Sequence, residues 1–285
     1  MKRTADMNTE LYANWNPWHG CTKCSEGCRF CYVYRQDGQR GTEIPSSLCR
    51  KTQAFDLPVK HRRNGSYKVA PGSVVFTCFS SDFLLKDADE WRPECWKMIR
   101  ERRDCFFYFF TKRIERFMDC VPQDWGEGYE NVIVGCTCEN QDRADFRLPI
   151  FSELPIRHKS IIIGPMLSPV DVSRYLSPEI EEVSCSGESG YQVRPLHYEW
   201  VLDVRNQCVE RNIPFVFHQT GAYFVKDGKM YHIPRKDQIA QARKAGIDFR
   251  MRENLFPETA EITRGTVQQR FDLSAAETGG DSRQV

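Results

Sequence analysis

The sequence predicts an α/β protein built on a partial (β/α)6-type parallel barrel, with an insertion after the first strand and a C-terminal extension. Short runs of apolar, β-branched and aromatic residues recur along the chain, and each has the length of a buried strand. Polar stretches typical of helices separate these runs, which favours parallel strands joined by crossover helices. The predicted strands cover residues 12–15, 73–79, 105–111, 131–138, 158–166, 180–187 and 213–221. This number of strands is larger than in most small doubly wound folds. An open or complete barrel of parallel strands fits it better.

The segments between and after the strands complete the predicted organisation. Residues 194–212 form a helix pattern in which Trp200, Val204 and Cys208 share one face. Residues 35–72 are expected to form the irregular insertion, and residues 224–250 a small hairpin and a short helix. We therefore expect the barrel domain to span residues 1–250. Residues 251–285 turn polar and are expected to be a largely disordered tail.

Composition narrows the class of protein. The 285 residues include 40 basic and 39 acidic side chains, so no overall field points to nucleic acid or a membrane. No apolar run approaches the about 20 residues of a membrane-spanning helix, and the start of the chain lacks the apolar segment of a secretory signal. We expect a cytoplasmic protein. Nine of the 13 cysteines are scattered, often within apolar runs, and are expected to be free and buried rather than disulfide-bonded.

Polar residues follow the predicted strands where each strand ends. The carboxyl ends of parallel strands meet at one edge, where chemistry collects in barrels and open α/β sheets alike. Any one of these polar ends is as well explained as a helix cap, but several on one rim indicate a site. The rim segments are residues 80–82, 111–113, 137–140, 187–190 and 218–221.

Four cysteines lie in the loop after the first predicted strand: Cys21, Cys24, Cys28 and Cys31. Two C-x-x-C pairs are compatible with a closed zinc site, although only three residues separate the pairs, fewer than is usual. A redox dithiol needs only two of the four thiols. Cys24, Cys28 and Cys31 have the spacing C-x-x-x-C-x-x-C, and three thiolates would leave one iron of a [4Fe–4S] cluster without a protein ligand. The sequence favours the cluster, with structural zinc as the alternative.

This spacing, with Phe30 before the last thiol, resembles the signature of radical S-adenosylmethionine enzymes. The segments "NPWHGCTKCSEGCRFCY", "SSDF", "TKRIERF", "ENQDRADFRLP", "GESG" and "FHQTGA" also resemble the three-cysteine-motif proteins of bacteria and phages, a family of unknown function considered similar to radical S-adenosylmethionine enzymes. The resemblance covers roughly residues 12–250. In that family the cysteines match Cys21, Cys28 and Cys31, whereas spacing favours Cys24 as the third ligand, and both alternatives stay open.

The resemblance implies two cofactors, a [4Fe–4S] cluster and S-adenosyl-L-methionine, which is cleaved to a 5′-deoxyadenosyl radical. Asp82 would accept a hydrogen bond from the methionine ammonium group, and the end of the fourth strand would meet the ribose. Binding of this cofactor is implied for Phe30, Ser80, Ser81, Asp82, Lys112, Thr137, Glu139 and Asn140. A carboxylate or phosphate would pair with Lys112 and Arg113. Later strands would face the substrate, through Glu188, Arg194, His218 and Gln219, although His218 is equally well explained as a core histidine.

Two positions depart from the family pattern. Gly164 stands where relatives carry an acidic residue, and Ser186 replaces the first of two glycines before "ESG". Radical chemistry would require a reducing electron donor of the flavodoxin or ferredoxin type, and the resemblance suggests a nucleic acid or nucleotide as substrate. The alternative is a zinc- or cluster-stabilised nucleic-acid-binding protein without catalysis, which would use the rim and the basic residues 60–68, "KHRRNGSYK". No residue identifies the substrate or the oligomeric state.

Overall fold

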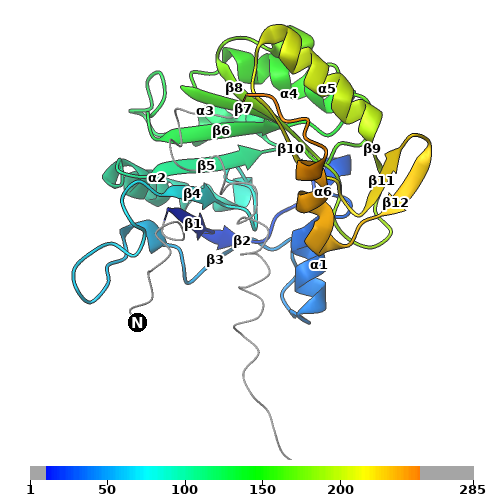
Figure 1. Ribbon diagram of the computed structural model, residues 1–285. Helices are drawn as coiled ribbons and strands as arrows, with labels where there is room; N and C mark the ends of the chain where they lie inside the picture. The colour runs from blue at the N-terminus through cyan, green and yellow to red at the C-terminus, as the bar shows by residue number, and fades with distance from the viewer. Residues whose placement is uncertain (1–10, 251–285) are drawn as a thin grey trace, which may run out of the picture.

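A computed structural model describes residues 11–250, and its centre is a sheet of seven parallel strands (Figure 1). The strands lie in the order β1-β4-β5-β6-β7-β8-β10. The sheet curls into a half-barrel, which confirms the predicted fold class. Its strands are β1 (Tyr12–Trp15), β4 (Val74–Thr77), β5 (Phe106–Thr111), β6 (Val132–Thr137), β7 (His158–Ile163), β8 (Ile180–Ser186) and β10 (Phe215–Gln219).

Helices cover the convex face of this sheet. They are α2 (Arg92–Glu101), the short α3 (Phe117–Cys120), α4 (Gln141–Glu153) and α5 (Tyr198–Arg211). On α5, Val204 and Cys208 are buried as predicted. Val201 is buried beside them, whereas Trp200 is only half-buried and stacks on His197 with ring centroids 4.3 Å apart. The amphipathic pattern thus identified the helix and most of its buried face.

The main core lies between the helices and the sheet. Eight of the nine scattered cysteines are buried there or at its margin, and Cys49 is half-buried against it. None of the 13 cysteines, all of which lie in the described part of the chain, forms a disulfide. The scattered thiols therefore behave as small apolar side chains, as expected.

The segment after β1 is more regular at its start than the sequence indicated. Residues 32–39 form helix α1 (Tyr32–Gln39), although irregular chain was expected from residue 35. The carboxylate of Asp37 on α1 contacts the His19 ring at 2.9 Å. This contact joins α1 to β2 (Trp18–His19), which pairs with β3 (Arg50–Lys51). A short, polar helix is therefore held in part by a hydrogen bond between Asp37 and His19 that its own pattern does not show.

The basic residues 60–68 form an exposed turn closed by an antiparallel bridge between His61 and Tyr67. The turn leads into β4 and projects from the amino-terminal edge of the sheet (Figure 1). Arg102 fixes its base, because the buried guanidinium donates to the carbonyls of Pro58 and Val69, the latter at 2.9 Å. Since the strands carry the rim at their other end, this basic turn and the rim lie on opposite edges.

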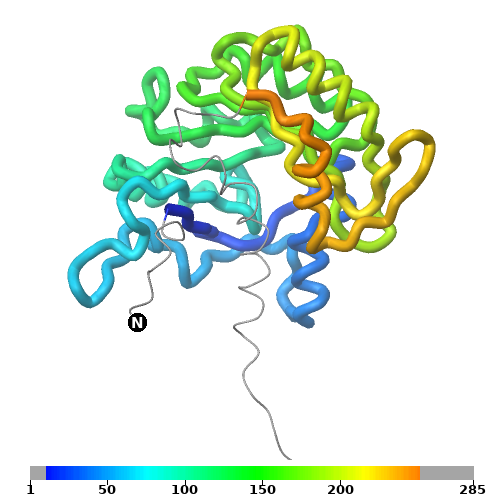
Figure 2. Tube along the Cα trace, in the orientation of Figure 1, coloured from blue at the N-terminus to red at the C-terminus, as the bar shows by residue number. Residues whose placement is uncertain are grey.

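The C-terminal part of the described chain returns to the open side of the half-barrel. β9 (Leu196–His197), β11 (Tyr223–Lys226) and β12 (Lys229–His232) form a separate small sheet, and α6 (Gln238–Lys244) packs beside β10 (Figure 2). The predicted hairpin and short helix are confirmed. Short 3-10 turns occur at Glu26–Cys28, Leu57–Val59, Lys86–Ala88, Ile114–Arg116, Ser173–Tyr175 and Arg235–Asp237.

Two expectations concern the ends of the chain and the membrane. The expected tail, residues 251–285, lies outside the described residues. Between residues 11 and 250, no helix combines the length and the apolar character required to cross a bilayer.

Candidate cysteine-lined site

A cavity of about 400 Å³ opens at the carboxyl edge of the half-barrel and extends into its concave face. Its lining includes Cys21, Cys28 and Cys31 from the cysteine loop, which we define as residues 21–31. Cys24 does not line the cavity and is exposed. The structure thus distinguishes the two candidate third thiols by position.

The thiols of the cysteine loop sit in different electrostatic surroundings. A hydrogen bond with the Cys24 thiol lowers the pKa of Cys28 well below its usual range, and the nearby Lys112 ammonium acts in the same direction against the effect of burial. Burial raises the pKa of Cys31, and burial also raises that of Cys21 to about 12 although Arg113 opposes it. The neighbours of Cys28 thus favour its thiolate form, whereas burial favours the protonated form of Cys21 and Cys31.

Asp82 and Arg113 hold the start of the cysteine loop. The carboxylate of Asp82 is 5 % exposed and accepts hydrogen bonds from the Thr111 hydroxyl at 2.8 Å and from the Lys112 backbone N–H at 3.0 Å. It also pairs with Arg113 at 3.1 Å, and the guanidinium of Arg113 donates to the Thr22 carbonyl at 2.5 Å. Asp82 orients Arg113 toward the loop and also lines the cavity, so its expected contact with a cofactor ammonium stays a prediction.

Ser80 and Ser81 hold the chain just before the loop. The Ser81 hydroxyl donates to the Gly20 carbonyl at 2.5 Å, and the Ser80 hydroxyl donates to the Trp18 carbonyl at 3.2 Å. Both side chains therefore make internal contacts, and of the two only Ser81 lines the cavity.

Glu139 holds the middle of the cysteine loop. It is fully buried, pairs with Arg147 at 2.5 Å and accepts a hydrogen bond from the Ser25 hydroxyl. Asn140 follows it as the N-cap of α4 and accepts from the Arg143 backbone N–H at 3.0 Å. Neither residue lines the cavity, although both were expected near the ribose. Their polar groups are used inside the protein.

Two more arginines hold the cysteine loop at Glu26 and beside Phe30. Arg143 makes a bidentate contact with the exposed carboxylate of Glu26, with both distances 3.0 Å. Arg194 donates to the Glu26 carbonyl at 2.9 Å, lies 5.4 Å from the Phe30 ring centroid and pairs with the buried Glu188. Of this last pair, expected to face substrate, Glu188 lines the cavity and Arg194 does not.

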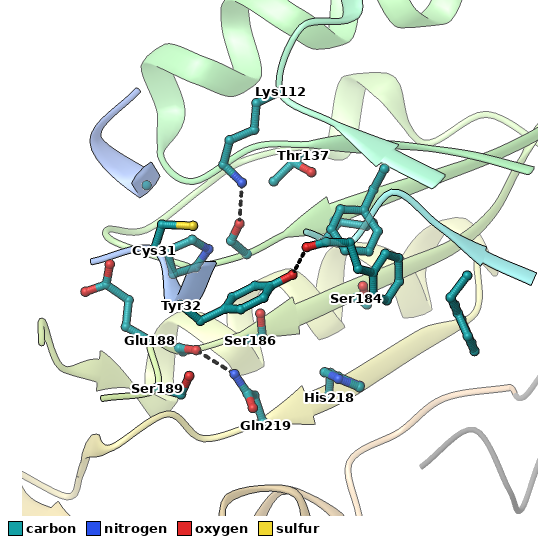
Figure 3. Close-up of a pocket in the computed structure, with 18 of the residues that line it drawn as sticks. Cys31, Tyr32, Lys112, Thr137, Ser184, Ser186, Glu188, Ser189, His218 and Gln219 are labelled. Carbon is teal, nitrogen blue, oxygen red and sulfur yellow. Dashed lines mark hydrogen bonds between the residues drawn. The ribbon is translucent and has the colours of Figure 1, made fainter. Parts of the chain in front are cut away.

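Other predicted residues line the cavity as well: Phe30, Arg113, Lys112, Thr137, His218 and Gln219, of which the last four are labelled in Figure 3. The Lys112 ammonium donates to the Gly164 carbonyl at 3.2 Å. The buried Oγ1 of Thr137 and the buried Oε1 of Gln219 have no hydrogen-bond partner among the described residues. Burial lowers the pKa of His218, and Arg243 adds to this effect. The four labelled residues thus offer polar atoms to a ligand.

The sequence did not single out several residues that line the same cavity. Tyr32 projects into its centre directly after Cys31, with its hydroxyl donating to the Phe79 carbonyl (Figure 3). Alternating positions on the strands supply the rest, and the period of two residues is the signal that could have found them. These lining residues include Phe76, Tyr108, Phe110, Glu182 and Ser184, and Ser186, which the sequence marked only as a departure from the family pattern, lines the cavity too.

The donor geometry bears on which metal group the loop could hold. Within residues 11–250, no group of three or more His, Cys, Asp or Glu side chains is placed so that it could hold a metal ion. A tetrahedral zinc ion with bonds of about 2.3 Å requires sulfur atoms roughly 3.8 Å apart. Ligands of a cluster bind different iron atoms, and they therefore stand farther apart than ligands of one ion.

The comparisons with known proteins give one match. The model of a family described as a protein of unknown function (DUF5131) matches residues 9–269. No curated protein and no solved structure matches the chain. Because the match spans most of the sequence, the chain belongs to the DUF5131 family, whose function is unknown.

Proposed function

We propose that the protein is a radical S-adenosylmethionine enzyme that binds a [4Fe–4S] cluster through Cys21, Cys28 and Cys31. The observation that carries the proposal is the position of these three thiols. They line one cavity at the carboxyl edge of a parallel half-barrel, while Cys24 lies outside it. The resemblance in the cysteine loop supports the same choice of Cys21 as third ligand.

The residues present fit such a group. Thiolates are the usual ligands of iron–sulfur clusters, and three of them leave one iron open to a small molecule. Three thiols that line the cavity, with the fourth outside it, match three-cysteine ligation of a cluster better than a closed four-ligand zinc site. The unpartnered Thr137 Oγ1 and Gln219 Oε1 offer a second ligand in the same cavity a hydrogen-bond donor and an acceptor.

When bound, the cluster and S-adenosylmethionine would together supply reductive cleavage of the cofactor to a 5′-deoxyadenosyl radical. The protein's own contribution is positioning. Arg113, Glu139 and Arg194 hold the cysteine loop against the rim. The Lys112 ammonium acts with the Cys24 thiol to lower the pKa of Cys28, which favours a thiolate ligand.

The walls of the cavity would protect a reactive intermediate from water. Phe79, Phe110 and Ile162 present apolar surface to its interior. The outer side of the loop, with exposed Lys23, Cys24 and Arg29, faces solvent. An electron donor of the flavodoxin or ferredoxin type would approach from that side, since electrons must reach the cluster from outside.

The test is electron paramagnetic resonance on anaerobically reconstituted, dithionite-reduced protein, with and without S-adenosylmethionine. We expect a reduced-cluster signal that changes when S-adenosylmethionine is added. Cys21→Ala, Cys28→Ala and Cys31→Ala should each lose this signal, while Cys24→Ala retains it. Cys49→Ala is the matched control, because Cys49 is half-buried outside the cavity.

Each other outcome assigns a different role to the loop. Loss of the signal in Cys24→Ala and its retention in Cys21→Ala would exchange the third ligand. One tightly held zinc ion per chain, with no cluster in any preparation, would contradict the radical-enzyme proposal. It would support a metal-stabilised binding protein instead.

A further inference from the structure

The cavity has two unlike walls beyond the cysteine loop. One wall, which we call the aromatic wall, is formed by five residues. They are Tyr12 on β1, Phe76 on β4, Phe79 just after β4, and Tyr108 and Phe110 on β5. A polar wall, formed by Ser184, Ser186 and His218, comes from β8 and β10. Figure 3 shows Ser184, Ser186 and His218 along the strands below and beside the Tyr32 ring. A ligand in this part of the cavity meets apolar ring faces on one side and hydrogen-bonding groups on the other.

Contacts between its rings hold the aromatic wall in place. The ring centroids of Phe79 and Phe110 are 4.6 Å apart, and those of Tyr108 and Phe110 are 6.3 Å apart. The Tyr108 hydroxyl reaches Ser160 on β7 at 3.1 Å. It can cross β6 because Gly135 carries no side chain, and a Cβ there would lie 2.9 Å from the Phe110 Cβ. The wall is therefore a preorganised surface rather than a set of loose side chains.

Two buried polar atoms indicate that this cavity takes a ligand with hydrogen-bonding groups. Thr137 is 1 % exposed, and its Oγ1 has no partner among the described residues. Gln219 Oε1 is likewise without a partner, although the Nε2 of the same amide donates to the Gly187 carbonyl at 3.0 Å. Buried polar groups are normally satisfied, so a ligand is the natural source of the missing contacts.

We propose that the substrate enters this part of the cavity as a nucleobase, with its ring face against the aromatic wall and its polar edge toward the polar wall. Purines and pyrimidines combine a flat aromatic face with a donor and acceptor edge, and proteins bind single bases by stacking and edge contacts. A hydrocarbon ring or a lipid chain would leave the polar wall without partners. A sugar carries no flat aromatic face to match the aromatic wall.

The inference extends the proposed function by naming its substrate class, but base binding itself requires no cluster. It can therefore be measured on the full-length protein without bound iron. A failure of base binding and a failure of cluster formation are then separate results.

The first arm of the test measures binding of nucleoside 5′-monophosphates by calorimetry, with ribose 5-phosphate as the ligand that lacks a base. A second arm uses a trinucleotide that carries the fluorescent base 2-aminopurine at its centre, and measures how far binding quenches the fluorescence of that base. We expect the monophosphates or the trinucleotide to bind, and ribose 5-phosphate to bind at least about tenfold more weakly. Tighter binding of the trinucleotide identifies a single strand as the source of the base, and tighter binding of a monophosphate identifies a free nucleotide.

Variants of the walls complete the test. Phe110→Leu should weaken binding of the base-containing probe by about tenfold because a stacking face is lost. Ser184→Ala should change the preference among the four bases. Tyr231→Leu is the matched control, since Tyr231 is an exposed aromatic residue on β12 outside the cavity, and it should leave the affinity unchanged. Thermal unfolding checks that each variant retains its fold.

Three results would overturn the proposal. The first is equal affinity for ribose 5-phosphate and the nucleotides, or no binding of any base. The second is wild-type affinity in a folded Phe110→Leu variant. The third is complete displacement of the bound base by S-adenosylhomocysteine, which would show that the cavity holds only the adenine of the cofactor.

Discussion

Gly164 and Ser186 face each other across the ends of β7 and β8, and a Cβ atom on Gly164 would lie 2.7 Å from the Ser186 Oγ. A side chain at position 164 therefore needs the space that the serine hydroxyl occupies. The resemblance found in the sequence led us to expect an acidic residue at the first of these positions and glycine at the second. The geometry indicates that one departure accommodates the other.

This relationship predicts a strong coupling between the two sites. Gly164→Asp alone should lower the free energy of unfolding by roughly 1–3 kcal/mol through overpacking. Combined with Ser186→Gly, the same substitution should regain most of the loss because the hydroxyl is gone. Urea unfolding of the two single variants and the double variant measures the coupling. Additive effects would show that the loop after β7 shifts freely to admit the new side chain.

A second prediction concerns the buried ion pair under the cysteine loop. Glu139→Gln leaves the 2 % exposed Arg147 side chain without its carboxylate and should cost about 3–5 kcal/mol of stability. Glu26→Gln is the control, because Glu26 pairs with Arg143 while 51 % exposed and should cost no more than about 1 kcal/mol. Chemical denaturation measures the free energy of unfolding of both variants. Similar losses of stability would contradict the distinction between the buried ion pair and the exposed one.

A third prediction concerns the mobility of the cysteine loop. Arg113→Lys keeps the positive charge but cannot contact Asp82 and Thr22 at once, so a charged hydrogen bond worth roughly 1.5–3 kcal/mol is lost. Amide hydrogen exchange around Thr22 should accelerate by about tenfold or more, while the β5 amides stay protected. Arg157→Lys, in the exposed pair with Glu130, is the control and should change neither region. Equal acceleration in the loop and in β5 would point to global destabilisation instead.

The pair formed by Arg102 and Asp104 predicts a pH dependence of stability. The hydrogen bond from the buried Arg102 guanidinium lowers the pKa of Asp104 below its usual value. A carboxylate with a depressed pKa in the folded state stabilises the protein above the pKa it has when unfolded, near 3.8. Its contribution is lost as the pH falls from there through the lower folded-state value.

Asp104→Asn should therefore lower the melting temperature at pH 7 by a few degrees, corresponding to about 1 kcal/mol for a partly exposed carboxylate. The difference from the wild type should shrink as both are titrated from pH 5 toward pH 2, followed by thermal unfolding at each pH. A difference that stays constant with pH would mean that the side chain acts through packing and not through its charge.

The fold was largely predictable because strand signals are local. The run from Tyr12 to Trp15 was identified at its observed bounds, and buried parallel strands show themselves as uninterrupted apolar runs. Helix α1 was not predicted, because few of its residues are apolar and its anchor at His19 lies outside the helix. Tertiary contacts there outweigh the local pattern.

The sequence predicted which residues belong to the candidate site better than it predicted the contacts that those residues make. Strand ends identify which polar residues reach the rim, and Lys112, Thr137, His218 and Gln219 do line the cavity. They do not reveal that Glu139 turns away from it to meet Ser25, a residue 114 positions earlier in the chain. Which neighbour a side chain faces depends on how the loop folds back, and that information is spread over the whole chain.

The order in which these contacts become available has a consequence for biosynthesis. Arg113 follows Thr22 by 91 residues, and Arg194 follows Glu26 by 168 residues. At roughly 5–20 residues per second, on the order of 10–30 seconds separate synthesis of the thiols from synthesis of the last arginine that holds their loop. For that interval the four loop cysteines belong to a nascent chain without their rim. Protection of these thiols from oxidation must then come from the cell until the half-barrel has closed on the loop.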